Sequence, residues 1–190
     1  MKTIFFFGVL HLLFLNSFSQ TAISCLIATD LGDIQIELYP EKVPITVANF
    51  LKYVDNKLYD GTNFYRVCTP ENEKERMVRI EVIQGGNVPD PPHFEPIQLE
   101  TTNQTGIRHQ NGTLSMARDK PNSATSSFFI CISDQPELDF AGLRNPDGQG
   151  FAAFGKVTKG MKVVRKIQAI KNKDQYLINP VVIHSIRRLD

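Results

Sequence analysis

The clearest alternation of apolar and polar residues lies early in the chain. Ile34, Ile36 and Leu38 alternate with polar residues, which is the pattern of a β-strand with one buried face. Turn-forming residues at 30–33 precede this run and predict a tight connection before it. Near the other end of the chain, the β-branched run at 180–183 predicts a closing strand.

Two segments carry the period of an amphipathic helix. The first starts at Pro44, which suits the first turn of a helix because an N–H is not needed there. The apolar residues that follow fall on one helical face: Val47, Phe50, Leu51 and Val54. The second segment begins after Gly160, and its apolar stripe consists of Val163, Val164, Ile167 and Ile170. We therefore predict two helices.

Short strand-like runs fill the sequence between these helices. They lie at 63–68, 79–84, 112–116, 128–132 and 151–157. Gly, Pro and Asn cluster between the runs, as is typical of turns, and the charged stretch 71–76 has no apolar period and predicts a solvated loop. Many short strands with few helices favour a mainly β fold whose sheet closes into a barrel, because closure removes exposed edges.

Length and charge narrow the class of protein. The chain has 190 residues, which suits one domain, since domains of about 100–150 residues are the most common. Its formal net charge is +1 and 42% of its residues are hydrophobic. No basic stripe of the kind that binds nucleic acid is present, so we expect no nucleic-acid partner. Nothing in the pattern suggests a large exposed apolar patch, and a monomer is expected.

The first residues resemble a secretory leader. Lys2 precedes an apolar run at 4–15, which is too short to span a membrane, because spanning takes about 20 residues. Small residues Ser17 and Ser19 follow, so cleavage would leave Gln20 at the new N-terminus. We expect a signal peptide at 1–19, a domain at 20–190, a periplasmic or secreted location, and no membrane contact after cleavage. An uncleaved anchor, a buried strand and a lipoprotein attached through Cys25 are the alternatives.

The cysteines and histidines give no sign of a metal centre. Cys25, Cys68 and Cys131 are odd in number and widely spaced, so they cannot all pair within one chain. Cys131 lies in an apolar run and is interpreted as a buried core residue. The histidines after the leader lack ligand spacing and are interpreted as surface or hydrogen-bonded loop residues: His93, His109 and His184.

Four motifs occur in an order that identifies a family. Phe-Tyr-Arg-Val at 64–67 is similar to Phe-His-Arg-Val/Ile, and Gln-Gly-Gly follows at 84–86. A long central signature covers 112–118 and 121–130, and Phe-Gly-Lys-Val at 154–157 leads into Gly-Met at 160–161. The chain resembles the cyclophilin-type peptidyl-prolyl isomerases over essentially all of the expected domain. The resemblance implies a closed eight-stranded antiparallel barrel capped by two helices, with an outer groove for an extended Xaa-Pro peptide.

The resemblance also implies a reaction that needs no nucleophile, metal or cofactor. The barrier to rotation about the peptide bond is about 18–20 kcal/mol because the nitrogen lone pair is delocalised into the carbonyl. Arg66 matches the family's hydrogen-bond donor to that nitrogen, and Gln84 matches the glutamine that holds substrate and arginine. An arginine of a surface ion pair is the alternative interpretation of Arg66 without these motifs.

The remaining site residues follow from the same resemblance. The substrate-binding positions are Phe129, Leu138, Val82, Ala117, Arg118, Phe151 and Ser127. Phe129 matches the floor of the proline pocket and Leu138 its aliphatic wall, whereas Ala117 and Arg118 would pair with the peptide through their backbone. Phe128 must face away from Phe129, because adjacent strand residues point to opposite faces.

Several positions depart from the family pattern. Counting back from Gln84 places Glu81 and Val82 where Phe and Met are usual, and Glu81 would lie close enough to pair with Arg66. Ser127 replaces the groove glutamine, Glu137 replaces Trp or Phe, and Phe151 replaces His. These changes predict weaker activity and weaker cyclosporin-like binding. Besides an isomerase that assists the folding of exported proteins, a weakly catalytic proline-peptide-binding or chaperone module and a lipocalin-like hollow barrel are the competing hypotheses.

Overall fold

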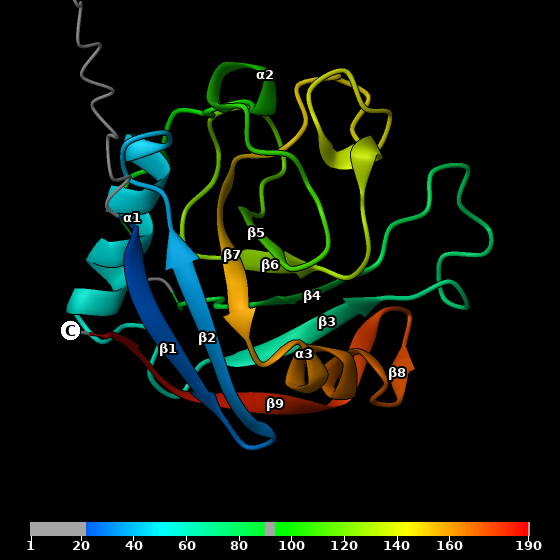
Figure 1. Cartoon of the computed structure of the whole chain (residues 1–190). Coiled ribbons are helices and arrows are strands. Elements are labelled where there is room, and N and C mark those ends of the chain that lie inside the picture. The colour runs from blue at the N-terminus through cyan, green and yellow to red at the C-terminus, as the bar shows by residue number, and fades with distance from the viewer. Residues whose placement is uncertain (1–21, 90–93, 190) are drawn as a thin grey trace, which may run out of the picture.

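The described part of the chain forms one closed antiparallel sheet. The structure is a computed structural model that describes residues 22–89 and 94–189, so the predicted leader at 1–19 lies outside the described residues. Eight strands pair in a ring, in the order β1 (Ile23–Thr29), β2 (Gly32–Leu38), β7 (Ala153–Lys159), β5 (Thr113–Met116), β6 (Phe128–Cys131), β4 (Val82–Gly85), β3 (Asn63–Cys68) and β9 (Tyr176–Arg188). Pairing of β1 with β9 closes the ring (Figure 1). The predicted eight-stranded antiparallel barrel is confirmed.

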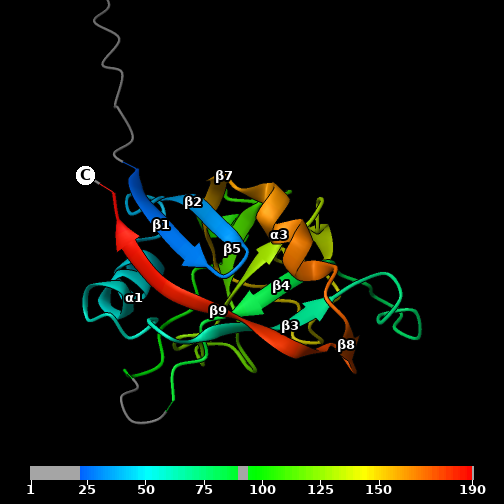
Figure 2. The same ribbon diagram turned by 90° about the horizontal axis from the view of Figure 1, so that it is seen from below.

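The two predicted helices flank the barrel. Helix α1 (Pro44–Asp55) and helix α3 (Met161–Gln168) lie on opposite sides of it in both views (Figures 1 and 2). A short helix α2 (Thr102–Thr105) and a 3-10 turn η1 (Pro136–Leu138) lie in the connections. None of the helices in the described ranges is long and apolar enough to cross a membrane.

Aromatic side chains fill the barrel. Phe50 of α1 has no exposed surface, and its ring lies 5.1 Å from that of Phe154, 5.2 Å from Tyr59 and 5.5 Å from Phe128. Packing of this kind leaves no room for an internal ligand. The lipocalin-like hypothesis is therefore wrong.

A second apolar cluster lies on the outside of the barrel wall. It consists of Cys68, Ile80, Val82, Phe129, Cys131, Leu138 and Phe151, all buried. Phe128 and Phe129 divide as the strand geometry predicts, since Phe128 belongs to the interior core and Phe129 to this outer cluster. The outer cluster forms the apolar base of the groove described below.

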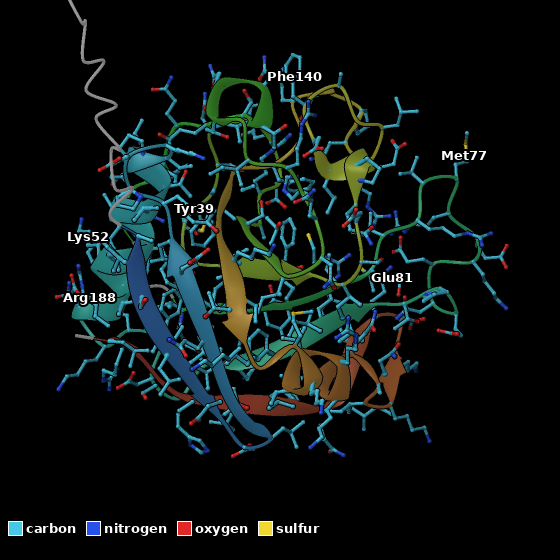
Figure 3. All side chains as sticks on the ribbon, in the orientation of Figure 1. Tyr39, Lys52, Met77, Glu81, Phe140 and Arg188 are labelled. Atoms are coloured by element: carbon cyan, nitrogen blue, oxygen red, sulfur yellow. The ribbon has the colours of Figure 1, made fainter. Side chains whose placement is uncertain are left out.

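Two connections carry residues toward the groove. The segment between β3 and β4 projects from the barrel, with Met77 fully exposed near its tip (Figure 3). The other is the hairpin that joins β8 (Asn172–Lys173) to β9, where Lys173 pairs with Tyr176. Its two turn residues, Asp174 and Gln175, have positive φ angles of 51° and 75°, as a type I′ turn requires.

The cysteines are free thiols in the described structure. Cys25, Cys68 and Cys131 are buried and make no disulfide. Burial raises the pKa of the Cys25 and Cys68 thiols to about 11, so both are protonated and unreactive at neutral pH. The interpretation of Cys131 as a buried core residue is confirmed.

Candidate active site

All nine predicted site residues line a single groove of about 560 Å³ on the barrel surface. They are Arg66, Val82, Gln84, Ala117, Arg118, Ser127, Phe129, Leu138 and Phe151. They come from strands β3, β4 and β6 and from the connections around β5 and η1. Residues separated by more than 80 positions in the sequence are thus brought together because the strands that carry them are neighbours in the sheet.

The base of the groove is an apolar pocket with rigid walls. Phe129 is only 4% exposed, and its ring meets that of Phe151 edge-on at 5.4 Å and 89°. Leu138 is fully buried beside them, and Val82 is 2% exposed. Fixed aromatic and aliphatic surfaces of this kind suit a compact apolar ring such as that of proline.

A buried histidine supports the pocket from below. The His109 ring stacks on Phe129 at 6.0 Å, its Nδ1 lies 2.8 Å from Asp139 Oδ1, and its Nε2 lies 2.9 Å from Ser115 Oγ. Burial lowers the pKa of His109, although Asp139 favours the charged form. For Asp139, burial disfavours ionisation, but the hydrogen bonds from His109 outweigh it and the pKa lies below its ordinary value. The sequence interpretation of His109 as a hydrogen-bonded residue is correct.

Arg66 lies at the edge of this pocket with its guanidinium held by two amide side chains. Its Nη1 donates to Gln84 Oε1 at 2.7 Å, and its Nε and Nη2 donate to Gln175 Oε1 at 2.9 and 2.5 Å. The group is partly exposed. Three of its five N–H groups are used by these described partners, which leaves two for a bound molecule.

Gln84 connects Arg66 to Tyr65 and, through the Tyr65 hydroxyl, to Ser127. Its Nε2 donates to the Tyr65 hydroxyl at 2.7 Å, and that hydroxyl lies 3.4 Å from Ser127 Oγ. The Tyr65 ring stacks on the exposed ring of Tyr176 at 6.4 Å. Ser127 therefore lines the groove and also contacts Tyr65, a contact that counting from Phe129 does not indicate.

Arg118 forms a side wall of the groove. Its side chain is 1% exposed, lies 5.2 Å from the Phe151 ring, and is held by Asp147 through two bonds of 2.8 Å. Its Nε also donates to the Gly150 carbonyl. Arg118 is expected to pair with the peptide through its backbone, and its side chain in addition forms this wall. The backbone N–H of Ala117 donates to the Ser127 carbonyl at 2.9 Å, so pairing of Ala117 with a peptide must use its carbonyl oxygen.

The structure contradicts the placement of Glu81 beside Arg66. Ile80, Val82 and Gln84 line the groove at every second position, and Glu81 therefore faces the other way. Its carboxylate lies 3.5 Å from Gln168 Nε2 and 3.5 Å from Ser133 Oγ (Figure 3 labels Glu81). Counting back from Gln84 is right at Val82 and wrong at Glu81, because adjacent residues of an extended segment point to opposite faces and Ile80 shares the face of Val82.

Glu137 also stays out of the groove. Its Oε2 accepts a hydrogen bond from the Leu143 backbone N–H at 2.8 Å, and it is not among the residues that line the cavity. The carboxylate thus stabilises its own connection.

Sequence reasoning missed several groove residues. Ile80, Arg76, Arg144 and Tyr176 line the cavity, and Gln175, which does not line it, contacts Arg66 more extensively than Gln84 does. Most of them come from the projecting segment and the β8–β9 hairpin, which lie outside the family motifs. The one available signal was the Asp-Gln pair in a two-residue turn, where Asn-Gly or Asp-Gly is usual.

Comparisons with known proteins agree with this geometry. Residues 24–188 match the family described as "Cyclophilin type peptidyl-prolyl cis-trans isomerase/CLD". A peptidyl-prolyl cis-trans isomerase of Acinetobacter baylyi is 43% identical over 144 residues, which cover 73% of this chain and 68% of the relative. One of Streptomyces antibioticus is 39% identical over 171 residues, which cover 85% of this chain and 95% of the relative.

Solved structures show the same fold. The crystal structure of a cyclophilin-type isomerase of Cryptosporidium parvum superimposes with a TM-score of 0.69 at 23% identity, covering 89% of this chain and 98% of that one. The chain belongs to the family of cyclophilin-type peptidyl-prolyl cis-trans isomerases. By enzyme class, it is a peptidyl-prolyl cis-trans isomerase.

Proposed function

We propose that the chain catalyses cis–trans isomerisation of Xaa-Pro bonds in polypeptides, with Arg66 and Gln84 as the catalytic pair. The observation that carries the proposal is the guanidinium of Arg66, fixed by Gln84 and Gln175 at the edge of a pocket whose base is Phe129. The Cryptosporidium relative was also crystallised in the presence of the dipeptide Ala-Pro, which supports a proline-containing peptide as the substrate class.

The position of the Arg66 guanidinium explains how rotation about the Xaa-Pro bond is accelerated. Twisting the Xaa-Pro bond out of plane localises the lone pair on the imide nitrogen, and a fixed N–H donor stabilises that state more than either planar state. Arg66 keeps two N–H groups for this purpose, and it stays charged at every physiological pH. The pocket around Phe129 holds the proline ring while the preceding carbonyl rotates.

Replacement of Arg66 tests this directly. One preorganised donor of this kind contributes about 100- to 1,000-fold to a rate, so Arg66→Ala is expected to lower kcat/KM by that factor. The measurement is a protease-coupled assay on Xaa-Pro peptides. Stability should change little, because Arg66 is partly exposed. Unchanged turnover in the variant would remove Arg66 from the mechanism.

A weakly catalytic proline-peptide-binding module is the second candidate. The positions that favour it are Ser127 and Glu137, which leave the groove without the family's glutamine and aromatic side chain. The predicted pairing of Glu81 with Arg66, which would have favoured this candidate further, does not occur. A module would retain peptide binding, without turnover, in both the parent chain and Arg66→Ala.

We further propose that the clients are exported proteins and that the chain acts in the periplasm or after secretion, as a monomer. Proline isomerisation is slow enough to limit folding, so an isomerase is useful where disordered chains arrive after export. The apolar run at 4–15 and the serines after it support a leader at 1–19 and a domain at 20–190. Mass spectrometry of the chain recovered from its host tests this, with Gln20 expected as the first residue and an intact Met1 contradicting it.

A further inference from the structure

A buried carboxylate lies behind the guanidinium of Arg66. Glu73 belongs to the projecting segment between β3 and β4, and its side chain has no exposed surface. It accepts hydrogen bonds from both terminal nitrogens of Arg144 and from Gln175 Nε2, the last at 2.5 Å. Arg76 lies 3.4 Å from the same carboxylate on the solvent side. Glu73 does not line the groove and does not contact Arg66.

The orientation of the Gln175 amide is fixed by its two charged neighbours, Arg66 and Glu73. Arg66 has only donors and an ionised Glu73 has only acceptors, so the oxygen of Gln175 must face Arg66 and its nitrogen must face Glu73. The distances agree, with Oε1 at 2.9 and 2.5 Å from Arg66 and Nε2 at 2.5 Å from Glu73. If the amide were reversed, its NH₂ would face the guanidinium, and Arg66 would lose two of its three bonds.

The backbone of Gln175 is unfavourable for this residue type. Its φ of 75° places it in the left-handed region, where the Cβ lies too close to the following carbonyl oxygen. Glycine or asparagine would suit the second position of this turn better. The backbone is held there because the Val67 N–H donates to the Gln175 carbonyl at 2.8 Å. A strained residue whose side chain contacts the candidate catalytic arginine points to a functional role for that side chain.

We propose that Glu73 is a positioning residue for isomerisation, acting through Gln175 to hold the Arg66 guanidinium toward the bound imide. This proposal rests on the proposed function of Arg66. Glu73 fixes the direction of the amide, the amide carbonyl anchors Nε and Nη2, and Gln84 anchors Nη1. Since Arg66 stabilises the twisted bond rather than the planar ones, loss of the anchor affects kcat and leaves KM nearly unchanged.

A double-mutant cycle in the full chain tests the proposal. Glu73→Gln allows the amide of Gln175 to reverse, and Gln175→Gly removes the anchor while relieving the strained backbone. Each is expected to lower kcat by about 10- to 100-fold, the range that a misplaced catalytic group produces. Both variants act on the hydrogen bonds between Arg66 and the Gln175 side chain. Once Gln175→Gly has removed those bonds, Glu73→Gln should lower kcat by less than about twofold further. Equal losses in both backgrounds would show that Glu73 does not act through Gln175.

Controls separate positioning from stability. Asp60→Asn is the matched carboxylate-to-amide change. Asp60 pairs with Arg187, and neither residue lines the groove, so this variant should leave kcat unchanged. Glu73→Gln could fail to fold because Arg144 loses its charged partner, and Glu73→Asp then takes its place. The shorter side chain keeps the charge but withdraws it from Gln175, and the same loss of kcat is expected. Full kcat in the folded Glu73 variants or in Gln175→Gly would overturn the proposal.

The same assay distinguishes failure of the two proposals. If Arg66→Ala retains parental turnover, the function proposed for Arg66 is wrong and Glu73 has nothing to position. If Arg66→Ala is inactive while the Glu73 and Gln175 variants keep full kcat, only the positioning role fails.

Discussion

The buried His109–Asp139 pair makes the stability of the protein depend on pH in a defined window. Burial lowers the pKa of His109 below its ordinary value of about 6.5. The unfolded chain therefore binds more protons than the folded chain as the pH falls below about 6.5, so the free energy of unfolding falls with it. One histidine contributes a slope of at most about 1.4 kcal/mol per pH unit. The loss ends once the pH passes the folded-state pKa.

Denaturant unfolding at a series of pH values between about 7.5 and 4.5 measures this slope. His109→Gln removes the titrating group while leaving a side chain that can still bond to Asp139 or Ser115, so the slope should become flatter by the contribution of one proton. The pKa of Asp139 is also lowered, but its contribution is lost only below its unfolded-state value of about 3.9. An identical pH dependence in the parent and in His109→Gln would refute the reasoning.

Three further predictions follow from the core and the groove. Phe50→Ala should lower the free energy of unfolding by about 3–5 kcal/mol in urea titrations. The same change at the exposed Leu31 should alter that free energy by no more than about 0.5 kcal/mol. Similar losses for both variants would contradict the packing described. Four arginines and one carboxylate, that of Asp119, are the charged residues that line the groove in the described chain. Arg118 pairs with Asp147, and Arg76 and Arg144 pair with Glu73, whereas the partners of Arg66 are neutral amides. Because of Arg66, peptides with Glu beside the proline should have a higher kcat/KM than those with Lys, by about two- to fivefold at low salt. High salt should abolish the preference for Glu, and a preference for Lys would contradict this prediction. Cyclosporin should inhibit weakly, since Glu137 takes the position of Trp or Phe in the family pattern and its side chain lies outside the groove, and nanomolar inhibition would be incompatible with this.

Much of the fold was predictable because local and tertiary preferences agree. Helix α1 begins at Pro44, and its predicted apolar face is buried against the barrel. The strand at 63–68 has the predicted bounds. Strand β1 was missed because apolar residues occupy both of its faces and hide the period of two, and β9 extends well past 180–183 because Pro180 does not interrupt it.

The site was predictable where it lies on the motif strands and unpredictable where it depends on the loops. Arg66 and Phe129 lie on paired strands whose register fixes their side chains. Glu73 and Gln175 lie about 100 positions apart in segments without a period, and only the folded chain brings them together. The error at Glu81 lies just before β4, where Ile80 rather than Glu81 shares the groove-facing side with Val82.

The role of Arg66 is tested most directly by the isomerisation rate of Arg66→Lys beside that of the parent chain. Lysine keeps the positive charge but has no planar fork to be held by both Gln84 and Gln175. We expect kcat/KM on an Xaa-Pro peptide to fall by more than tenfold, with unfolding by denaturant almost unchanged. If Arg66→Lys turns over as fast as the parent chain, charge alone is sufficient and the account of a fixed hydrogen-bonding fork is wrong.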